Sequence, residues 1–229
     1  MKNQIDESNQ DRIFLSKFRV FQINDVYLLK NLPRLATYIQ DHMSIPLPSL
    51  KNEIKKNEPF TEITKQIDPE TGKTVITTIT TVIVVSGDFL APSLLSSLDG
   101  GKGMVDVLHA IGVTHVSLGN HEDDVPTDAL TQHIDANKFE WVNTNLRGLD
   151  EALDVVTAEC SWIEFGHENS QKKRVAILGL LSDDPSLYRP GAFGDAVERL
   201  ESPKGAIERL MTSLQDADVV VPMTHLDMA

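Results

Sequence analysis

The sequence predicts an α/β fold in layers, with a mainly parallel sheet that hairpins make mixed. Strand-like segments rich in β-branched residues alternate with segments whose apolar residues recur every three or four positions, as they do in helices. Two pairs of neighbouring strand-like segments predict the hairpins. Polar residues follow several of the strands where each one ends. In layered α/β folds ligands bind beyond the carboxyl ends of the strands, so a site is expected at that edge.

The first predicted strand runs from Arg12 to Ile23 and stops at Asn24 and Asp25. The helix after it is indicated by leucine and isoleucine residues at three- and four-residue spacing. It tolerates Pro33 only in its first turn, because proline lacks the N–H that an interior helical position must donate. Asp25 is therefore expected on a strand-to-helix turn.

A β-branched stretch dominates the next part of the chain. Residues 45–57 are aperiodic and predict a surface loop, and residues 60–67 alternate weakly, as in a strand. The segment 68–72 carries the Asp, Pro and Gly of a turn. Every residue of 74–85 is β-branched, which crowds a helix and suits a pleated sheet. We expect a hairpin that leads into a buried strand ending at Asp88.

The remaining elements repeat this alternation. Helices are predicted over 103–111, 127–134 and 203–214, strands over 113–118, 141–142 and 219–221, and a hairpin from 162–163 to 175–181. Strand 113–118 ends at Gly119-Asn120-His121-Glu122, and the last strand ends at Thr224-His225. Polar residues from four strand ends are thus expected to converge.

Composition and charge argue against some classes of fold and partner. The chain has 229 residues, of which 24% are charged and 41% apolar, and its glycines and prolines are spread along it, so one globular domain is expected. A net charge of −13 repels phosphate backbones and anionic lipids, which argues against a nucleic-acid polymer or a membrane as partner. A small anionic substrate requires a local cation that inverts this field. Oligomeric state is open.

Location is predicted from cysteine use and apolar runs. The single Cys160 cannot form an internal disulfide, which fits a reducing compartment. The first residues are polar, unlike a secretory signal, and the longest apolar runs, 82–85 and 175–181, are far shorter than a membrane span. These features predict a cytoplasmic protein.

The converging residues suggest metal chemistry. Two carboxylates, an amide oxygen and imidazole nitrogens are the donors that suit a pair of divalent metal ions. Two such ions about 3.5 to 4 Å apart can clamp a phosphate and generate a hydroxide nucleophile near neutral pH. They would supply the positive field that an acidic chain lacks.

Four ordered blocks resemble those of the calcineurin-like metallophosphoesterases, and within them the 5′-nucleotidase-like branch. The blocks are Asn24-Asp25-Val26-Tyr27 for the family's D-x-H, Gly87-Asp88 for its G-D, Gly119-Asn120-His121-Glu122 for its G-N-H-E, and His225 for its lone histidine. The resemblance covers most of the chain from Phe18 onward and is most specific at the third block and in the order of the blocks. It implies an α/β/β/α sandwich with mixed sheets and hydrolysis of a small phosphate ester, such as a nucleotide, by a hydroxide activated by two metals.

The resemblance also assigns metal ligands. Asp25 is implied to bind the first metal, Asp88 to bridge both metals, and Asn120 and His225 to bind the second. The two ions are divalent, and Mn, Zn, Mg and Fe all remain open. A carboxylate, an amide or a histidine at a strand end is also a common turn residue, helix cap or satisfied polar group, and this simpler interpretation stays open for each residue.

Two further residues are implied to act at the phosphate. His121 would stabilise the transition state or protonate the leaving oxygen, and Asp124, three residues later, would orient it. The alternatives are a surface histidine and an exposed loop acid, since residues 122–124 form a local acidic run.

Two departures from the family pattern bear on activity. Tyr27 replaces the histidine expected two residues after Asp25, and a neutral phenol with a pKa of about 10 is a poor ligand for a divalent ion. A metal bond to Tyr27 and a tyrosine packed beside a weaker site are both open. The family's last block, G-H-x-H, does not occur before Ala229.

We expect one metallophosphoesterase-like domain over residues 1–229, incomplete at its C-terminal end, with residues 1–11 disordered.

The rival hypothesis is a non-catalytic binding or scaffolding domain that kept the fold and lost its metals. A chain that folds poorly, because a sheet cut near its last strands exposes a β-branched edge, is a third alternative.

Overall fold

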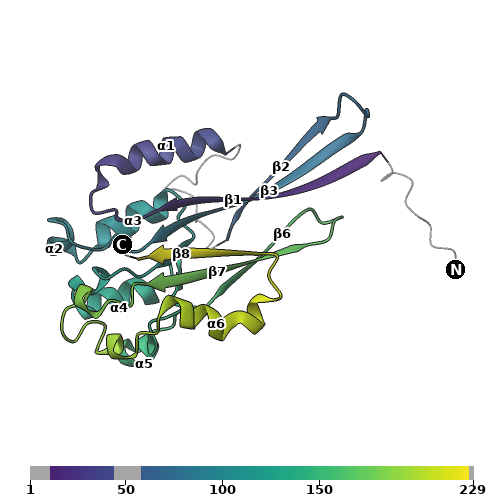
Figure 1. The fold of residues 1–229 in the computed structure, drawn as a ribbon. Coiled ribbons are helices and arrows are strands. Elements are labelled where there is room, and N and C mark those ends of the chain that lie inside the picture. The colour runs from purple at the N-terminus through teal and green to yellow at the C-terminus, as the bar shows by residue number, and fades with distance from the viewer. Residues whose placement is uncertain (1–10, 44–57, 227–229) are drawn as a thin grey trace.

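Two β-sheets lie face to face with helices on their outer sides (Figure 1). The computed structural model describes residues 11–43 and 58–226. Helix α1, Leu32–His42, lies outside the larger sheet, and α6, Pro203–Leu214, lies outside the smaller one. This is the predicted layered α/β/β/α arrangement with mixed sheets.

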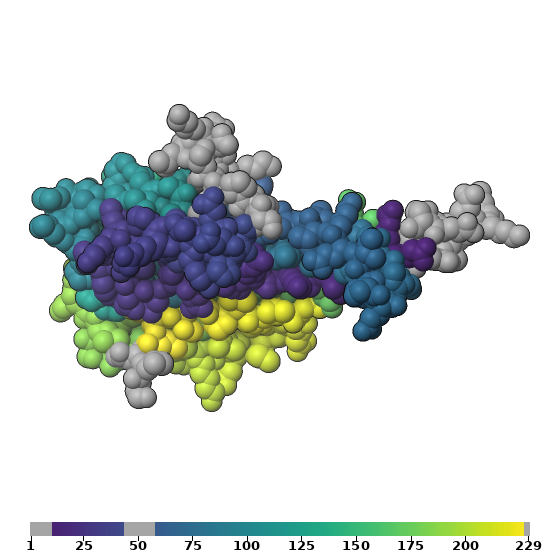
Figure 2. Space-filling model, turned by 90° about the horizontal axis from the view of Figure 1, so that it is seen from above, coloured from purple at the N-terminus to yellow at the C-terminus, as the bar shows by residue number. Residues whose placement is uncertain are grey.

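The larger sheet is organised by its longest strand, β3. Its strands are β1 (Arg12–Ile23), β2 (Phe60–Ile67), β3 (Thr74–Ser86), β4 (His115–Ser117) and β5 (Glu140–Val142). The order is β1-β3-β4-β5, all parallel, and β2 pairs antiparallel with the first part of β3. The β2–β3 hairpin consequently extends to one side of the layers, as Figure 2 shows.

The smaller sheet contains β6 (Ser161–Phe165), β7 (Lys173–Leu181) and β8 (Val219–His225). Strands β6 and β7 form the predicted hairpin, and β8 pairs parallel with β7. The parallel strands of both sheets therefore direct their carboxyl ends toward the same edge of the molecule (Figure 1).

Alternate residues of β3 divide the core, because successive strand side chains point to opposite faces. Val82 and Val84 pack against Val175 and Ile177 of β7, between the two sheets. Ile83 and Val85 face the other way and join an apolar cluster with residues of α1, α3 (Lys102–Ala110) and α4 (Thr127–Asp135). A β-branched strand buried on both faces explains the continuous apolar run in the sequence.

Most predicted elements occur where the sequence indicates them, with small shifts. Residues 29–31 form a 3₁₀ turn, and α1 begins at Leu32, with Pro33 in its first turn as required. Strand β4 is shorter than the predicted 113–118. The sequence did not predict two short helices, α2 (Ser96–Asp99) and α5 (Leu149–Leu153), which are too short for an apolar period to develop.

The loop predicted over 45–57 and the disorder predicted over residues 1–10 lie outside the described residues. Asp11, also predicted to be disordered, instead accepts a hydrogen bond from the Thr74 N–H through its carbonyl, which extends the pairing of β1 with β3. Among the helices of the described residues, none is both long and apolar enough to cross a membrane.

Candidate metal centre

Four of the predicted site residues come together where the strands of both sheets end. Asp25 follows β1, Asp88 follows β3, Asn120 follows β4, and His225 is the last residue of β8. Three of them belong to the larger sheet, and His225 belongs to the smaller one. The site therefore spans the seam between the sheets.

The turns after β3 and β4 touch because both contain glycine. Gly87 has a φ of 83°, and a Cβ there would lie 2.6 Å from the Gly119 nitrogen. A Cβ on Gly119 would lie 2.1 Å from Asp88 Oδ1. Asp25 and Asp88 themselves have φ values of 53° and 55°, a region that aspartate tolerates better than most residues. The G-D and G-N pairs are thus explained by close backbone approach.

Tyr27 joins the first two carboxylates. Its hydroxyl lies 3.0 Å from Asp25 Oδ1 and 2.8 Å from Asp88 Oδ2, and it donates to them. Burial and the two carboxylates raise the pKa of Tyr27, so the group is a neutral phenol. Ligand atoms of Asp25, Asp88 and His225 lie within 4.8 Å of one another, close enough to surround an ion.

His225 contacts oxygens on both sides of its ring. Its Nε2 lies 3.1 Å from Asn120 Oδ1 and 3.3 Å from Asp88 Oδ2. Its Nδ1 lies 3.0 Å from the Ser86 carbonyl oxygen and 3.1 Å from Asn24 Oδ1. Burial lowers the pKa of His225, but the Asp88 carboxylate outweighs burial and raises this pKa to about 9. Burial acts on Asp88 in the opposite direction and raises its pKa. Hydrogen bonds from His225 and the His121 N–H outweigh burial, so the pKa of Asp88 is lowered overall.

These contacts fit a cation. The Ser86 carbonyl can only accept, so His225 Nδ1 carries a proton and donates it. The lone pair of neutral Nε2 then faces two acceptors, Asn120 Oδ1 and Asp88 Oδ2. The nitrogen and the two oxygens beside it therefore need either a proton on Nε2, which the raised pKa of His225 favours, or a metal ion between them. One carboxylate, one amide oxygen and one imidazole are suitable ligands for a divalent ion.

His121 and Asp124 form a pair beside this cluster. His121 Nδ1 lies 2.6 Å from Asp124 Oδ2, and the two side chains are 38% and 37% exposed, within reach of a molecule in solution. The His121 backbone N–H donates to Asp88 Oδ1 at 3.0 Å, which couples the pair to the carboxylate cluster. The structure thus places Asp124 where the sequence expects an orienting acid.

Glu122 has a structural role that the sequence did not reveal. Its side chain is fully buried and accepts hydrogen bonds from the backbone N–H groups of Asp88, Phe89, Leu90 and Gly119, at 2.8, 2.8, 3.1 and 2.5 Å. Burial raises the pKa of Glu122, and the backbone donors oppose that effect. One carboxylate therefore fixes both turns that carry Asp88 and Asn120.

Arg189 is the second contact that sequence reasoning missed. Its Nη2 lies 2.5 Å from Asp123 Oδ2 and donates to the Asp123 carbonyl oxygen at 2.9 Å. Asp123 is buried, and Arg189 comes 66 residues later in the chain, in the loop after β7. No local pattern signals an ion pair over such a separation.

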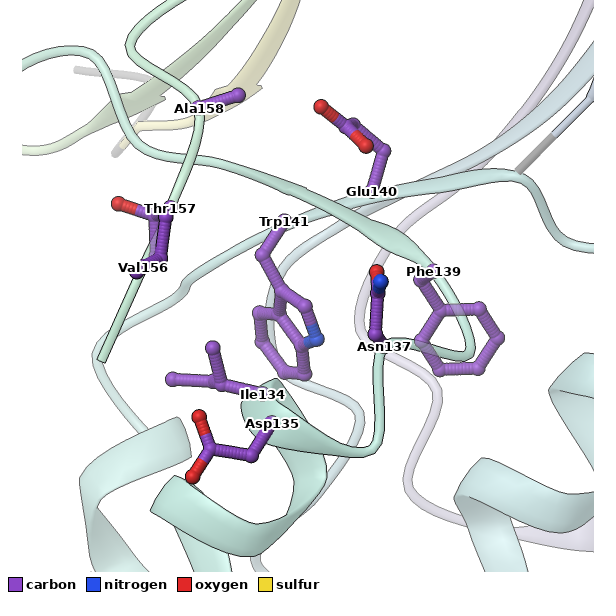
Figure 3. A pocket seen from close by; sticks show the side chains of 9 residues that line it. All are labelled: Ile134, Asp135, Asn137, Phe139, Glu140, Trp141, Val156, Thr157 and Ala158. Atoms are coloured by element: carbon purple, nitrogen blue, oxygen red, sulfur yellow. The ribbon is translucent and has the colours of Figure 1, made fainter. Parts of the chain in front are cut away.

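A separate hollow of about 350 Å³ lies beside α4 and β5 (Figure 3). It is lined by Ile134, Asp135, Asn137, Phe139, Glu140, Trp141, Val156, Thr157 and Ala158. None of the predicted site residues contributes to it, so it is distinct from the candidate metal centre.

Curated relatives match about half of the chain, whereas no family model matches it. A 5′-nucleotidase of Vibrio vulnificus is 25% identical over 119 residues, and one of Vibrio parahaemolyticus is 28% identical over 120 residues. Each match covers 51% of this chain and 20% of the relative. The matched half of the chain thus corresponds to about a fifth of the length of each relative.

Solved structures match more of the chain. A putative 5′-nucleotidase from Staphylococcus aureus has a TM-score of 0.55 at 12% identity, over 91% of this chain and 37% of that one. The NAD nucleotidase of Haemophilus influenzae has a TM-score of 0.52 at 14% identity, over 93% and 34% of the two chains. The calcineurin-like phosphoesterase YfkN of Bacillus subtilis has 0.50 at 13% identity, over 95% and 63%. The chain therefore has a calcineurin-like, 5′-nucleotidase-like fold, which it shares with part of each of these proteins.

Proposed function

We propose that the chain is a metal-dependent hydrolase of phosphate esters whose substrate is a small phosphomonoester such as a 5′-nucleotide. The observation that carries the proposal is that oxygens of Asp88 and Asn120 lie within 3.3 Å of one nitrogen of His225, beside the half-exposed His121 and its carboxylate partner Asp124. The names of the two curated relatives, both 5′-nucleotidases, support the nucleotide as substrate.

The residues divide into holding and proton-handling groups. Asp88, Asn120 and His225 would hold a divalent ion, and Asp25 is the adjacent carboxylate. When bound, divalent metal supplies positive charge that attracts phosphate and lowers the pKa of a coordinated water. This charge is needed because the chain carries a net charge of −13. The two ions expected from the resemblance stay a prediction.

His121 is the proposed catalytic side chain at the phosphate. Asp124 accepts a hydrogen bond from Nδ1 at 2.6 Å and so fixes the ring; when the ring is doubly protonated, its Nε2 can donate a hydrogen bond to a phosphate oxygen or a proton to the leaving oxygen. The His121 backbone N–H, bound to Asp88, keeps this ring next to the ion-holding residues. One connected set of hydrogen bonds supports the roles proposed for His121 and Asp124.

Asp88→Asn tests the proposal. We expect Mn²⁺-dependent release of phosphate from AMP and from p-nitrophenyl phosphate to fall at least about a hundredfold, the scale lost when a charge-stabilising group is removed. Asp216→Asn is the matched control, since Asp216 is exposed and remote from the centre. Near-normal turnover in Asp88→Asn would contradict the proposal.

A non-catalytic binding domain is the second candidate. The observation that favours it is Tyr27, whose hydroxyl already occupies the space between two of the expected ligands. Folded protein that binds no ion would favour this alternative.

A single domain over residues 1–229 and a cytoplasmic location also stay predictions.

A further inference from the structure

One oxygen of the Asp88 carboxylate, Oδ2, contacts two groups that offer different chemistry, the Tyr27 hydroxyl and the His225 ring. On one side the Tyr27 hydroxyl donates to Asp88 Oδ2 at 2.8 Å and to Asp25 Oδ1 at 3.0 Å. On the other side Asn120 Oδ1 and His225 Nε2 lie 3.1 Å apart, and His225 Nε2 lies 3.3 Å from Asp88 Oδ2. The first side contains a bound hydrogen-bond donor, whereas the second contains acceptors.

A neutral hydroxyl between two carboxylates does part of what a cation would do. It brings a proton to oxygens of Asp25 and Asp88 and so reduces the repulsion between them. A metal ion in the same space would need the hydroxyl to turn away, because the hydroxyl lies against the two oxygens that the ion would bind. Ligand atoms of Asp25, Asp88 and His225 lie within 4.8 Å of one another, but an ion bound between Asp25 and Asp88 would have to displace this hydroxyl.

On the other side this part is left to a proton on His225 Nε2 itself, which a metal ion can replace. The His225 ring is fixed by the Ser86 carbonyl and Asn24, which lie on its Nδ1 edge. Fixing the second nitrogen of a ligating histidine in this way is a usual feature of metal sites. Asp88 is likewise fixed by the N–H of His121 at 3.0 Å.

We propose that this chain binds one divalent ion, at Asp88, Asn120 and His225, and that the Tyr27 hydroxyl takes the neighbouring position between Asp25 and Asp88 and excludes a second ion. The inference rests on the proposed function. It assigns Asp25 to hydrogen bonding with Tyr27 rather than to the ion.

Counting bound Mn²⁺ tests the proposal directly. The full chain is stripped with chelator, loaded with Mn²⁺ and desalted, and bound manganese per chain is measured by elemental analysis and electron paramagnetic resonance. We expect one ion per chain with the spectrum of an isolated Mn²⁺. In Tyr27→His, which replaces the donor with an imidazole lone pair, we expect two ions. Their spectrum should show exchange coupling, since paired ions lie about 3.5 to 4 Å apart.

A pair of identical substitutions separates the two carboxylates. Asp25→Asn should keep one ion per chain with an affinity within about threefold of the unchanged chain, and Asp88→Asn should weaken binding at least about thirtyfold, as loss of a charged ligand does. Ile67→His controls for an added imidazole, because Ile67 is 74% exposed on the β2–β3 hairpin, and should stay at one ion. Thermal melting of the stripped proteins verifies that each variant is folded.

The outcomes separate this inference from the proposed function. Two ions in the unchanged chain, or loss of an ion in Asp25→Asn, would overturn the inference and leave the hydrolase proposal standing. One ion in folded Tyr27→His would also overturn it, because the hydroxyl would not be what excludes the second ion. No ion in the unchanged chain would refute the metal centre itself, and with it the proposed function.

Discussion

The two halves of the candidate metal centre differ in how firmly they are held. The turns after β3 and β4 are tied together by the buried Glu122 carboxylate through four backbone hydrogen bonds. Asp25, after β1, is exposed, and the hydrogen bond recorded for its side chain comes from Tyr27. Asp88 and Asn120 are therefore preorganised by the bonds of Glu122 to their turns, whereas the Asp25 side chain, within the described residues, is held by the Tyr27 hydroxyl.

Glu122→Gln is expected to give the largest effect on the firmly held half. An amide has one acceptor oxygen and would turn an NH₂ group toward backbone N–H donors, which leaves buried donors unpaired. We expect the free energy of unfolding to fall by about 3 kcal/mol or more, measured by urea denaturation.

Glu151→Gln is the control for Glu122→Gln. Glu151 is 81% exposed in its side chain and pairs with Arg199, so its replacement should change stability by less than about 0.5 kcal/mol. Equal stability of the two variants would show that Glu122 does not hold the turns together.

The firmly held half also predicts a pH dependence through His115, the first residue of β4. Burial lowers the pKa of His115 to about 4, below the 6.5 of an exposed histidine. The folded state therefore favours the neutral ring. The contribution of this ring to the free energy of unfolding is complete above pH 6.5 and is lost as the pH falls toward 4. Between pH 7 and pH 4.5 the loss is about 2 to 3 kcal/mol.

His115→Gln isolates that contribution from other titrating groups. Glutamine keeps polar atoms for Thr114 and Ser161, which hydrogen bond to the His115 ring. We compare the free energy of unfolding of His115→Gln with that of the unchanged chain at pH 7 and at pH 4.5. The difference between the two proteins should shift by about 2 to 3 kcal/mol in favour of the variant as the pH falls. A constant difference would contradict the assignment.

The smallest effect is expected from Asn24, on the less firmly held half. Asn24→Ala removes one of two acceptors at His225 Nδ1, and the Ser86 carbonyl keeps the ring oriented. Mn²⁺ affinity, measured by calorimetry, should fall by no more than about tenfold, with stability changed by less than about 1 kcal/mol. Complete loss of binding would show that Asn24 is essential to the centre.

The sequence predicts this fold well where patterns are local. The β-branched run of β3, the spacing of apolar residues in α3 and α6, and Pro33 in the first turn of α1 are all properties of neighbouring residues. The order of the polar blocks likewise predicts which strand ends meet, because parallel strands end at one edge.

Long-range packing sets the limit of such prediction. Glu122 stands in the G-N-H-E block, yet only the tertiary structure shows that it is buried under the turn of another strand. The Arg189 pair with Asp123 and the position of the Tyr27 hydroxyl between two carboxylates also depend on residues distant in sequence. The assignment of Asp25, Asp88, Asn120 and His225 as ligands, and of His121 and Asp124 as catalytic residues, stays a prediction.

The most direct measurement is the position of manganese in a crystal of the chain grown with Mn²⁺. Anomalous diffraction at the manganese edge should give a peak within bonding distance of Asp88, Asn120 and His225, about 2.0 to 2.3 Å from their ligand atoms. A peak at that point would confirm that Asp88, Asn120 and His225 hold the ion. Well-ordered density for these three side chains with no peak between them, or a peak elsewhere on the molecule, would contradict it.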